Sequence, residues 1–193
     1  MNRSWIHRMA CAVLCVDLLS GCATGYLLDN QVQAFSSLPA LPAQPTYRFE
    51  RLPSQQQPSQ AALEALADPA LHRAGLRRDD AAPAYSVQVS ARIQQVLSPW
   101  ADPWGGGWGG GFIHGPHFLS PFPRWQQPWY VREVSVVVRE LAGSRVVFES
   151  RAASDGPWLP PQAVVPAMFD AALQGFPAAP AGVRRVDIRL GPR

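Results

Sequence analysis

Residues 129–152 read WYVREVSVVVRELAGSRVVFESRA, with an apolar run on each side of the pair Ala142-Gly143. Apolar and polar residues alternate along both runs, which is typical of β-strands that bury one face. A tight turn containing glycine between two such runs predicts an antiparallel hairpin. The side chains expected to face the core are those of Tyr130, Val134, Val136, Val138, Val146 and Phe148.

Three further segments repeat with a period of two. Residues 85–93 alternate most strictly, which predicts a strand with one buried and one wet face. Its expected core residues are Tyr85, Val87, Val89, Ala91 and Ile93. Residues 46–52 and residues 186–190 are shorter amphipathic runs, and each predicts one more strand.

Two segments have the spacing of helices instead. The first follows Ser59, which can cap a helix, and its apolar face holds Leu63, Leu66, Ala70 and Leu71. Pro69 interrupts it and should kink the helix or restart it, with Asp68 as a new cap. The second helix is predicted over residues 161–176, and its apolar stripe holds Val165, Met168, Phe169, Ala172 and Phe176.

These elements predict an α+β fold. Both helices have an apolar stripe that must be covered, and one face of a sheet can cover both. We expect a single domain over residues 46–193, with a mostly antiparallel sheet of about five to six strands and two helices packed on one face. Residues 22–45 are expected to be a tether, in which Val32 and Phe35 could start a short first strand.

A long hairpin insertion rich in glycine, tryptophan and proline separates two of the predicted strands at residues 98–128. It contains Trp100, Trp104, Trp108 and Trp125. A loop of this length without secondary structure is either functional or disordered. It could be a hairpin tip without a partner. It could instead be a contact site for an envelope protein, a glycan or lipid headgroups, because indole rings stack on sugars and lie at membrane interfaces.

A metal site in the insertion is a third interpretation. His114 and His117 lie three residues apart, but no third ligand is close in the sequence. Apart from His7 near the N-terminus, His72 is the remaining histidine, and a zinc site needs three or four ligands. We therefore expect neither a metal nor a cofactor.

The N-terminus has the features of a secretory signal. Arg3, His7 and Arg8 precede an apolar segment at residues 9–20 that is too short to span a bilayer. Residues 19–22 then read Leu-Ser-Gly-Cys, the pattern that bacterial signal peptidases cut before a lipidated cysteine.

This pattern predicts a lipoprotein signal peptide at residues 1–21, with Leu19, Ser20 and Gly21 as the cleavage motif and Cys22 as the lipidated residue. Cys11 and Cys15 would be removed with the signal, so that Cys22 is the single cysteine left and can form no internal disulfide. Several acyl chains on this residue would anchor the protein stably. Ala23 after the cysteine favours the outer membrane.

Composition argues against two classes of function. The chain has 17 basic residues, all arginine, against 14 acidic ones, and they are scattered rather than gathered into the basic stripe that nucleic acid requires. No Gly-x-Ser-x-Gly motif occurs, and acylation of Cys22 would leave no free thiol. We therefore expect neither a nucleic-acid partner nor an enzyme.

Several short motifs resemble those of a known family. They are Phe35 with Leu38-Pro39, Tyr47-Arg48-Phe49, residues 63–67, Pro69-Ala70-Leu71 with Gly75-Leu76, and residues 85–89. Over roughly residues 30–190 the chain resembles bacterial lipoproteins that carry the domain of unknown function 4136. The resemblance implies an α+β envelope domain of Gram-negative bacteria and carries over no catalytic residue.

The sequence thus predicts a lipoprotein on the periplasmic face of the outer membrane, held by its lipid anchor. We expect a non-catalytic interaction or accessory component of the envelope, with an envelope protein or a glycan as partner. One alternative is a lipoprotein that binds a small ligand or glycan in the cleft between sheet and helices. Another is a hydrolase without a recognisable motif.

Overall fold

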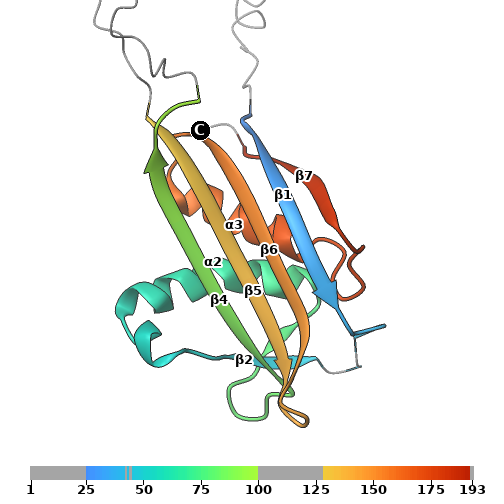
Figure 1. Cartoon of the computed structure of the whole chain (residues 1–193). Helices are drawn as coiled ribbons and strands as arrows, with labels where there is room; N and C mark the ends of the chain where they lie inside the picture. The colour runs from blue at the N-terminus through green and yellow to red at the C-terminus, as the bar shows by residue number, and fades with distance from the viewer. Residues whose placement is uncertain (1–24, 42, 44, 100–127, 192–193) are drawn as a thin grey trace, which may run out of the picture.

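Seven β-strands form one mixed sheet, and two helices lie across one of its faces (Figure 1). The computed structural model describes residues 25–191 except 42, 44 and 100–127. The elements are β1 (Leu27–Ser36), β2 (Thr46–Phe49), a 3-10 turn (Pro53–Gln55), α2 (Pro58–Arg73), β3 (Arg77–Arg78), β4 (Tyr85–Val96), β5 (Trp129–Glu140), β6 (Arg145–Pro157), α3 (Pro161–Leu173) and β7 (Val183–Arg189). The strand order β3-β2-β4-β5-β6-β1-β7 confirms a mostly antiparallel α+β fold, with more strands than expected.

The predicted hairpin is formed by β5 and β6. Val134 lies opposite Ala152, and Val138 lies opposite Phe148, in antiparallel register. The side chains of Val134, Val136 and Val138 are buried against the helices, as the alternation predicted. Tyr130, at the start of β5, is half-buried.

The expectation that Val146 faces the core is wrong, because β6 contains a β-bulge. Val138 pairs with Phe148, but the next residue, Arg139, pairs with Val146, so that Val147 is an extra residue on β6. An extra residue reverses the inward-outward alternation on its side of the bulge. Val147 is accordingly buried at 1% exposure, whereas Val146 is 39% exposed.

The first strand that residues 22–45 could contain is present, and it is longer than expected. Strand β1 lies inside the sheet, antiparallel to β6 on one side and to β7 on the other. Its core-facing residues are Leu28, Asn30, Val32 and Ala34, all buried. Asn30 and the intervening glutamines conceal the apolar period in the sequence, so the strand appeared short and uncertain.

Strand β2 gives the sheet its parallel part. It pairs in parallel with β4, where Tyr47 lies opposite Tyr85, and with the two-residue strand β3. Parallel neighbours need a crossover connection, and helix α2 provides it between β2 and β4. The strand expected at residues 46–52 ends at Phe49.

Helix α2 is one continuous helix, so of the two outcomes expected at Pro69, a kink or a restart, the restart does not occur. Pro69 lies inside Pro58–Arg73, where the burial of Ala70 and Leu71 keeps the last turn packed on the core. Ser59 is not the cap; the helix begins with Pro58, whose missing N–H would be unpaired there in any case. Asp68 accepts a hydrogen bond from Tyr47 instead of capping a helix.

Helix α3 ends at Leu173, three residues earlier than expected. Gly175, with a φ of +83°, turns the chain away from the helix in a conformation that favours glycine. Phe176 therefore lies beyond the helix, where its ring packs edge-on against Phe148 with centroids 4.8 Å apart. The remaining expected core residues, Val165, Met168, Phe169 and Ala172, are buried between α3 and the sheet.

Candidate functional site

One end of the sheet gathers several chain segments that are far apart in the sequence. Leu27 at the start of β1 lies opposite Arg189 of β7, and Val96 at the end of β4 lies opposite Trp129. Trp129 also pairs with Pro157, the last residue of β6. We call this the insertion end, because both sides of the insertion, at Pro99 and Pro128, adjoin it (the upper end in Figure 1).

The insertion end carries exposed apolar side chains. Leu97 is 83% exposed and Trp158 is 54% exposed. The other large apolar residues exposed there are Leu27, Val96 and Val131. The ring of Trp158 lies against Tyr130 with centroids 5.0 Å apart, while the Trp129 indole donates to Asp155 at 2.7 Å. Grouped exposed apolar residues of this kind mark contact surfaces for proteins or membranes.

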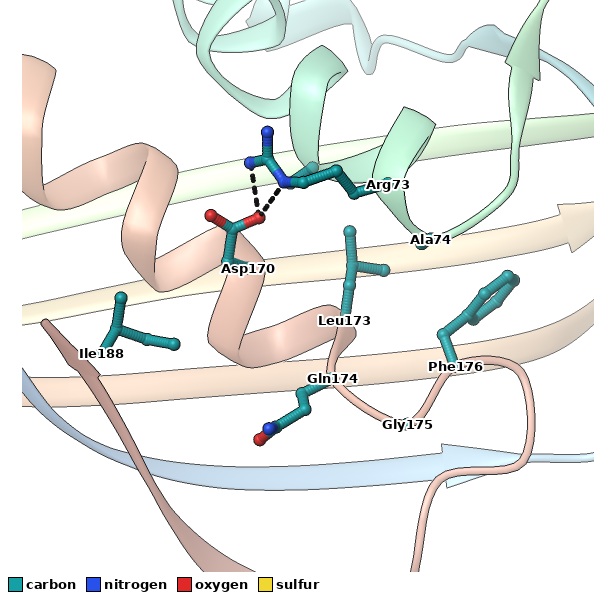
Figure 2. Close-up of a pocket in the computed structure, with 9 residues that line it drawn as sticks. Arg73, Ala74, Asp170, Leu173, Gln174, Gly175, Phe176 and Ile188 are labelled. Atoms are coloured by element: carbon teal, nitrogen blue, oxygen red, sulfur yellow. Dashed lines mark hydrogen bonds and ion pairs between the residues drawn. The ribbon is translucent and has the colours of Figure 1, made fainter.

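A shallow groove lies between the C-terminal ends of α2 and α3 and strand β7 (Figure 2). Its volume is about 480 Å³, and its apolar walls include Ala70, Leu173, Phe176 and Ile188. At its rim the guanidinium of Arg73 donates to Asp170 Oδ1, from Nε at 2.9 Å and from Nη2 at 2.5 Å. The groove thus combines apolar walls with one polar pair, the two kinds of group that a small-molecule site uses.

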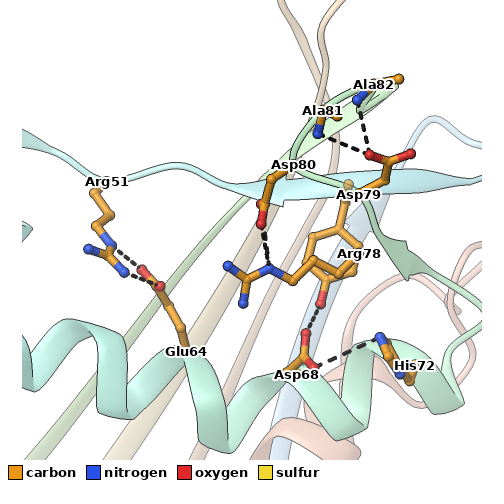
Figure 3. A network of polar contacts seen from close by, with 10 residues as sticks. Arg51, Glu64, Asp68, His72, Arg78, Asp79, Asp80, Ala81 and Ala82 are labelled. Carbon is orange, nitrogen blue, oxygen red and sulfur yellow. Dashed lines mark hydrogen bonds and ion pairs between the residues drawn. The ribbon is translucent and has the colours of Figure 1, made fainter.

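Two polar contacts connect α2 with the segment around β2 (Figure 3). In the first, Arg51 binds Glu64 through two hydrogen bonds of 2.6 Å each, and the Glu64 carboxylate is only 3% exposed. The hydrogen bond to Glu64 raises the pKa of Arg51. This bidentate pair satisfies a carboxylate that burial would otherwise destabilise.

In the second, the hydroxyl of Tyr47 donates to Asp68, whose other oxygen lies 3.8 Å from Nε2 of His72. Burial raises the pKa of Tyr47, and the hydrogen bond to Asp68 raises it further. The Tyr47 side chain is fully buried, so it remains a protonated donor. A tyrosine, an aspartate and a histidine in contact could suggest a relay, but the buried tyrosine cannot reach a substrate and holds β2 onto α2.

A family comparison agrees with this architecture. The family model described as "Domain of unknown function (DUF4136)" matches residues 31–178. The chain belongs to the DUF4136 family. The match begins within β1 and ends just after Phe176, so it includes the sheet and both helices except for β7. No curated protein matches the sequence.

Several solved structures are similar to this DUF4136 domain at low sequence identity. A PDZ domain protein from Parabacteroides distasonis has a TM-score of 0.50 and 12% identity, with 89% of this chain and 41% of that chain covered. A PelC dodecamer from Paraburkholderia phytofirmans has a TM-score of 0.47 and 11% identity, with coverage of 75% and 94%. A minor lipoprotein from Acinetobacter baumannii has a TM-score of 0.32 and 11% identity, with coverage of 67% and 84%.

The site residues predicted for this DUF4136 protein lie outside the described residues. They are Leu19, Ser20, Gly21 and Cys22 of the signal and Trp100, Trp104, Trp108 and Trp125 of the insertion. His114 and His117 lie outside them as well. Within the described part of the chain, no group of three or more histidine, cysteine or acidic residues could hold a metal ion. No helix in that part is long and apolar enough to cross a membrane.

The structure also shows a buried arginine that the sequence analysis did not single out. Arg132 lies on β5 with the same parity as Val134 and is 1% exposed. A charged residue at a core-facing strand position was the available signal, because arginine is almost never fully buried unless it is paired. Asn30 on β1 is a second polar residue at a core-facing position, and it is fully buried.

Proposed function

We propose that this DUF4136 protein is a lipid-anchored envelope lipoprotein whose insertion end faces the membrane. It acts there as a non-catalytic interaction component, held at the periplasmic face of the outer membrane by acyl chains on Cys22. The observation that carries the proposal is the short separation, along the sequence, between Cys22 and the first strand of the sheet. Only five residue steps separate Cys22 from Leu27, the first residue of β1.

Five extended residues reach at most about 17 Å. A lipidated Cys22 would therefore hold the start of β1 close to the lipid headgroups, and the whole insertion end with it. Trp158, Leu97 and the Tyr130 ring lie at that end. Aromatic side chains are favoured at membrane interfaces, so the exposed residues and the anchor support the same orientation.

The anchor is tested by replacing Cys22 with serine in the full chain and expressing it in a Gram-negative host. We expect the Cys22→Ser protein to keep its signal peptide and to incorporate no labelled palmitate. Cys15→Ser is the matched control, because Cys15 belongs to the segment that is removed; it should be processed and labelled as the wild type is. Equal palmitate labelling of Cys22→Ser and wild type would contradict lipidation at this residue.

The orientation is tested with a fluorophore on a new cysteine in the processed lipoprotein, where acylation of Cys22 leaves the new thiol as the one reactive site. Leu97→Cys places the probe at the insertion end, and Phe35→Cys places it at the opposite end, where Phe35 is also well exposed. In vesicles of phosphatidylethanolamine and phosphatidylglycerol, brominated lipids should quench the probe at position 97 and leave position 35 bright. The reverse pattern would rule out the proposed orientation even if the lipid anchor is present.

Binding of a small apolar ligand is a second candidate, and the groove between α2 and α3 favours it. Ala74→Trp would fill this groove, whereas Ala81→Trp places an equal side chain in an exposed loop. If the groove binds apolar molecules, anilinonaphthalene sulfonate fluorescence should fall with Ala74→Trp and not with Ala81→Trp. Equal fluorescence from both variants would remove the groove as a ligand site.

A further inference from the structure

Arg132 occupies a position that the fold otherwise gives to apolar side chains. It continues the core-facing row of Val134, Val136 and Val138 along β5, toward the insertion end. Its Nη2 donates to the carbonyl oxygen of Pro157, and its guanidinium lies 5.9 Å from the centroid of the Tyr130 ring. These contacts fix the orientation of the side chain and leave its other terminal nitrogen without a partner.

Nη1 of Arg132 is buried and makes no hydrogen bond in the described structure. Arg132 makes no ion pair of contact distance with a described carboxylate, and Asp155 acts on its charge only through space. Burial lowers the pKa of Arg132, which reflects the cost of holding this cation away from water. A buried cation without a counterion is strongly unfavourable, and a bound anion removes that penalty.

Other unsatisfied polar atoms lie on the same face of the sheet. Ser154 is directly opposite Arg132, and its hydroxyl also lacks a partner. Asn30 belongs to the same row. In the register of β1 with β6, Val32 pairs with Ala152, which places Asn30 opposite Ser154. Its Nδ2 donates to Leu28 and Val186, which leaves Oδ1 unpaired. Three of the four buried side-chain atoms without a partner in the described residues thus belong to this row.

Gly156 brings a further donor close to the guanidinium. A Cβ atom at this position would lie 2.8 Å from the Tyr26 hydroxyl and 3.6 Å from Nη1 of Arg132. Because Gly156 has no Cβ, the Tyr26 hydroxyl and Nη1 of Arg132 can both lie close to this position. The hydroxyls of Tyr26 and Ser154 can rotate to donate toward an acceptor beside Nη1.

We propose that Arg132, Tyr26 and Ser154 form a binding site for a single anionic oxygen group of the carboxylate or phosphate class. Arg132 supplies the charge, and the two hydroxyls supply neutral donors. The oxygen of Asn30 accepts from a hydroxyl on the ligand or from a water bound beside it. An anion fits better than one water molecule, because its oxygens offer more acceptor positions to Nη1 and to the two hydroxyls. The anion is either free in solution or part of a lipid headgroup, and the site does not depend on the lipid anchor.

The test measures thermal unfolding of the processed full-length lipoprotein in non-ionic detergent at constant ionic strength. Sodium chloride, whose anion carries no oxygen, is exchanged for sodium acetate or sodium phosphate in one arm. Short-chain phosphatidylglycerol is added in the other, so that the two sources of anion are distinguished. At ten times the Kd, a bound anion should raise Tm by about 3–5 °C.

Arg132→Met keeps a long side chain, removes the charge and should abolish this rise without lowering Tm in chloride, because a buried charge without a hydrogen-bonded counterion has been lost. Arg151→Met is the control, since Arg151 is an exposed arginine on the outer face of β6. If Arg132→Met does not fold, Tyr26→Phe carries the test, and it should weaken the rise. A Tm that does not respond to either anion source, or that responds equally in wild type and Arg132→Met, would overturn the proposal and leave only buried water at this place.

Discussion

The hydrogen bond from Tyr47 to Asp68 should make the free energy of unfolding decrease at alkaline pH. Substitution of Tyr47 isolates this effect. Tyr47→Phe removes only the hydroxyl, which is fully buried and donates to a carboxylate. A hydrogen bond to a charged group contributes about 1.5–3 kcal/mol, so we expect the free energy of unfolding to fall by that amount at pH 7. Urea unfolding followed by circular dichroism measures the difference.

The pH dependence is the sharper readout. The folded-state pKa of Tyr47 lies above its unfolded value of about 10. Its contribution is therefore complete below pH 10 and is lost as pH rises, because the unfolded chain ionises first. Between pH 10 and 11 the wild type should therefore lose about 1 kcal/mol of its free energy of unfolding through Tyr47, and Tyr47→Phe should not.

Two features of the chain make this comparison clean. The sequence has no lysine, so tyrosines dominate the titration between pH 10 and 11. Burial and the nearby Glu140 also raise the pKa of Tyr85, but that residue is present in both proteins and cancels. If wild type and Tyr47→Phe lose the same stability between pH 10 and 11, the hydroxyl of Tyr47 is not held protonated by the fold, and the reasoning fails.

Three sets of substitutions test the packing, each by urea unfolding. Phe169→Ala should cost about 3–5 kcal/mol, because the ring is fully buried in α3; a loss below about 1 kcal/mol would contradict its place in the core. Val147→Thr should cost about 1–3 kcal/mol, whereas Val146→Thr should stay within about 0.5 kcal/mol, and the opposite ranking would disprove the bulge. Arg51→Met leaves the Glu64 carboxylate buried and unpaired and should cost about 1–3 kcal/mol; replacing Glu64 with methionine as well should recover most of this loss, and no recovery would show that the pair is not coupled.

Local patterns predicted the centre of the fold well. Val134, Val136 and Val138 lie at alternate positions of one strand, and the glycine turn that follows predicts its antiparallel pairing with the next strand. The stripe of α3 was equally clear, because its apolar residues repeat at helical spacing. These segments contain enough buried surface for their own periodicity to determine which side faces the core.

The errors arose where a tertiary contact outweighs the local pattern. Asn30 faces the core because two backbone carbonyls accept from its amide, and a sequence gives no sign of such partners. Pro69 stays within α2 because the packing of that helix compensates for one lost hydrogen bond. The bulge at Val147 could not be predicted, since Val146 and Val147 are chemically identical and only the register with β5 distinguishes them.

The candidate sites likewise differ in how far the sequence alone predicts them. The motif ending at Cys22 is local, so the sequence alone predicts it, while the α2–α3 groove brings together residues from three distant segments. Arg132 lay within reach of the sequence analysis, as an arginine in a row of valines. Its unpaired nitrogen, its neighbour Tyr26 and the gap left by Gly156 appear only once β1, β5 and β6 are placed side by side.

The pairing of the last strand with the first has a practical consequence for anyone who labels this protein. The amide of Leu190 donates to the carbonyl of Tyr26, so the end of the described chain lies beside its beginning, at the insertion end (Figure 1). A fluorescent fusion at this end would lie close to the bilayer if Cys22 is acylated. The exposed turn between β5 and β6, around Ala142 and Gly143, lies at the far pole and is the better place to graft a reporter.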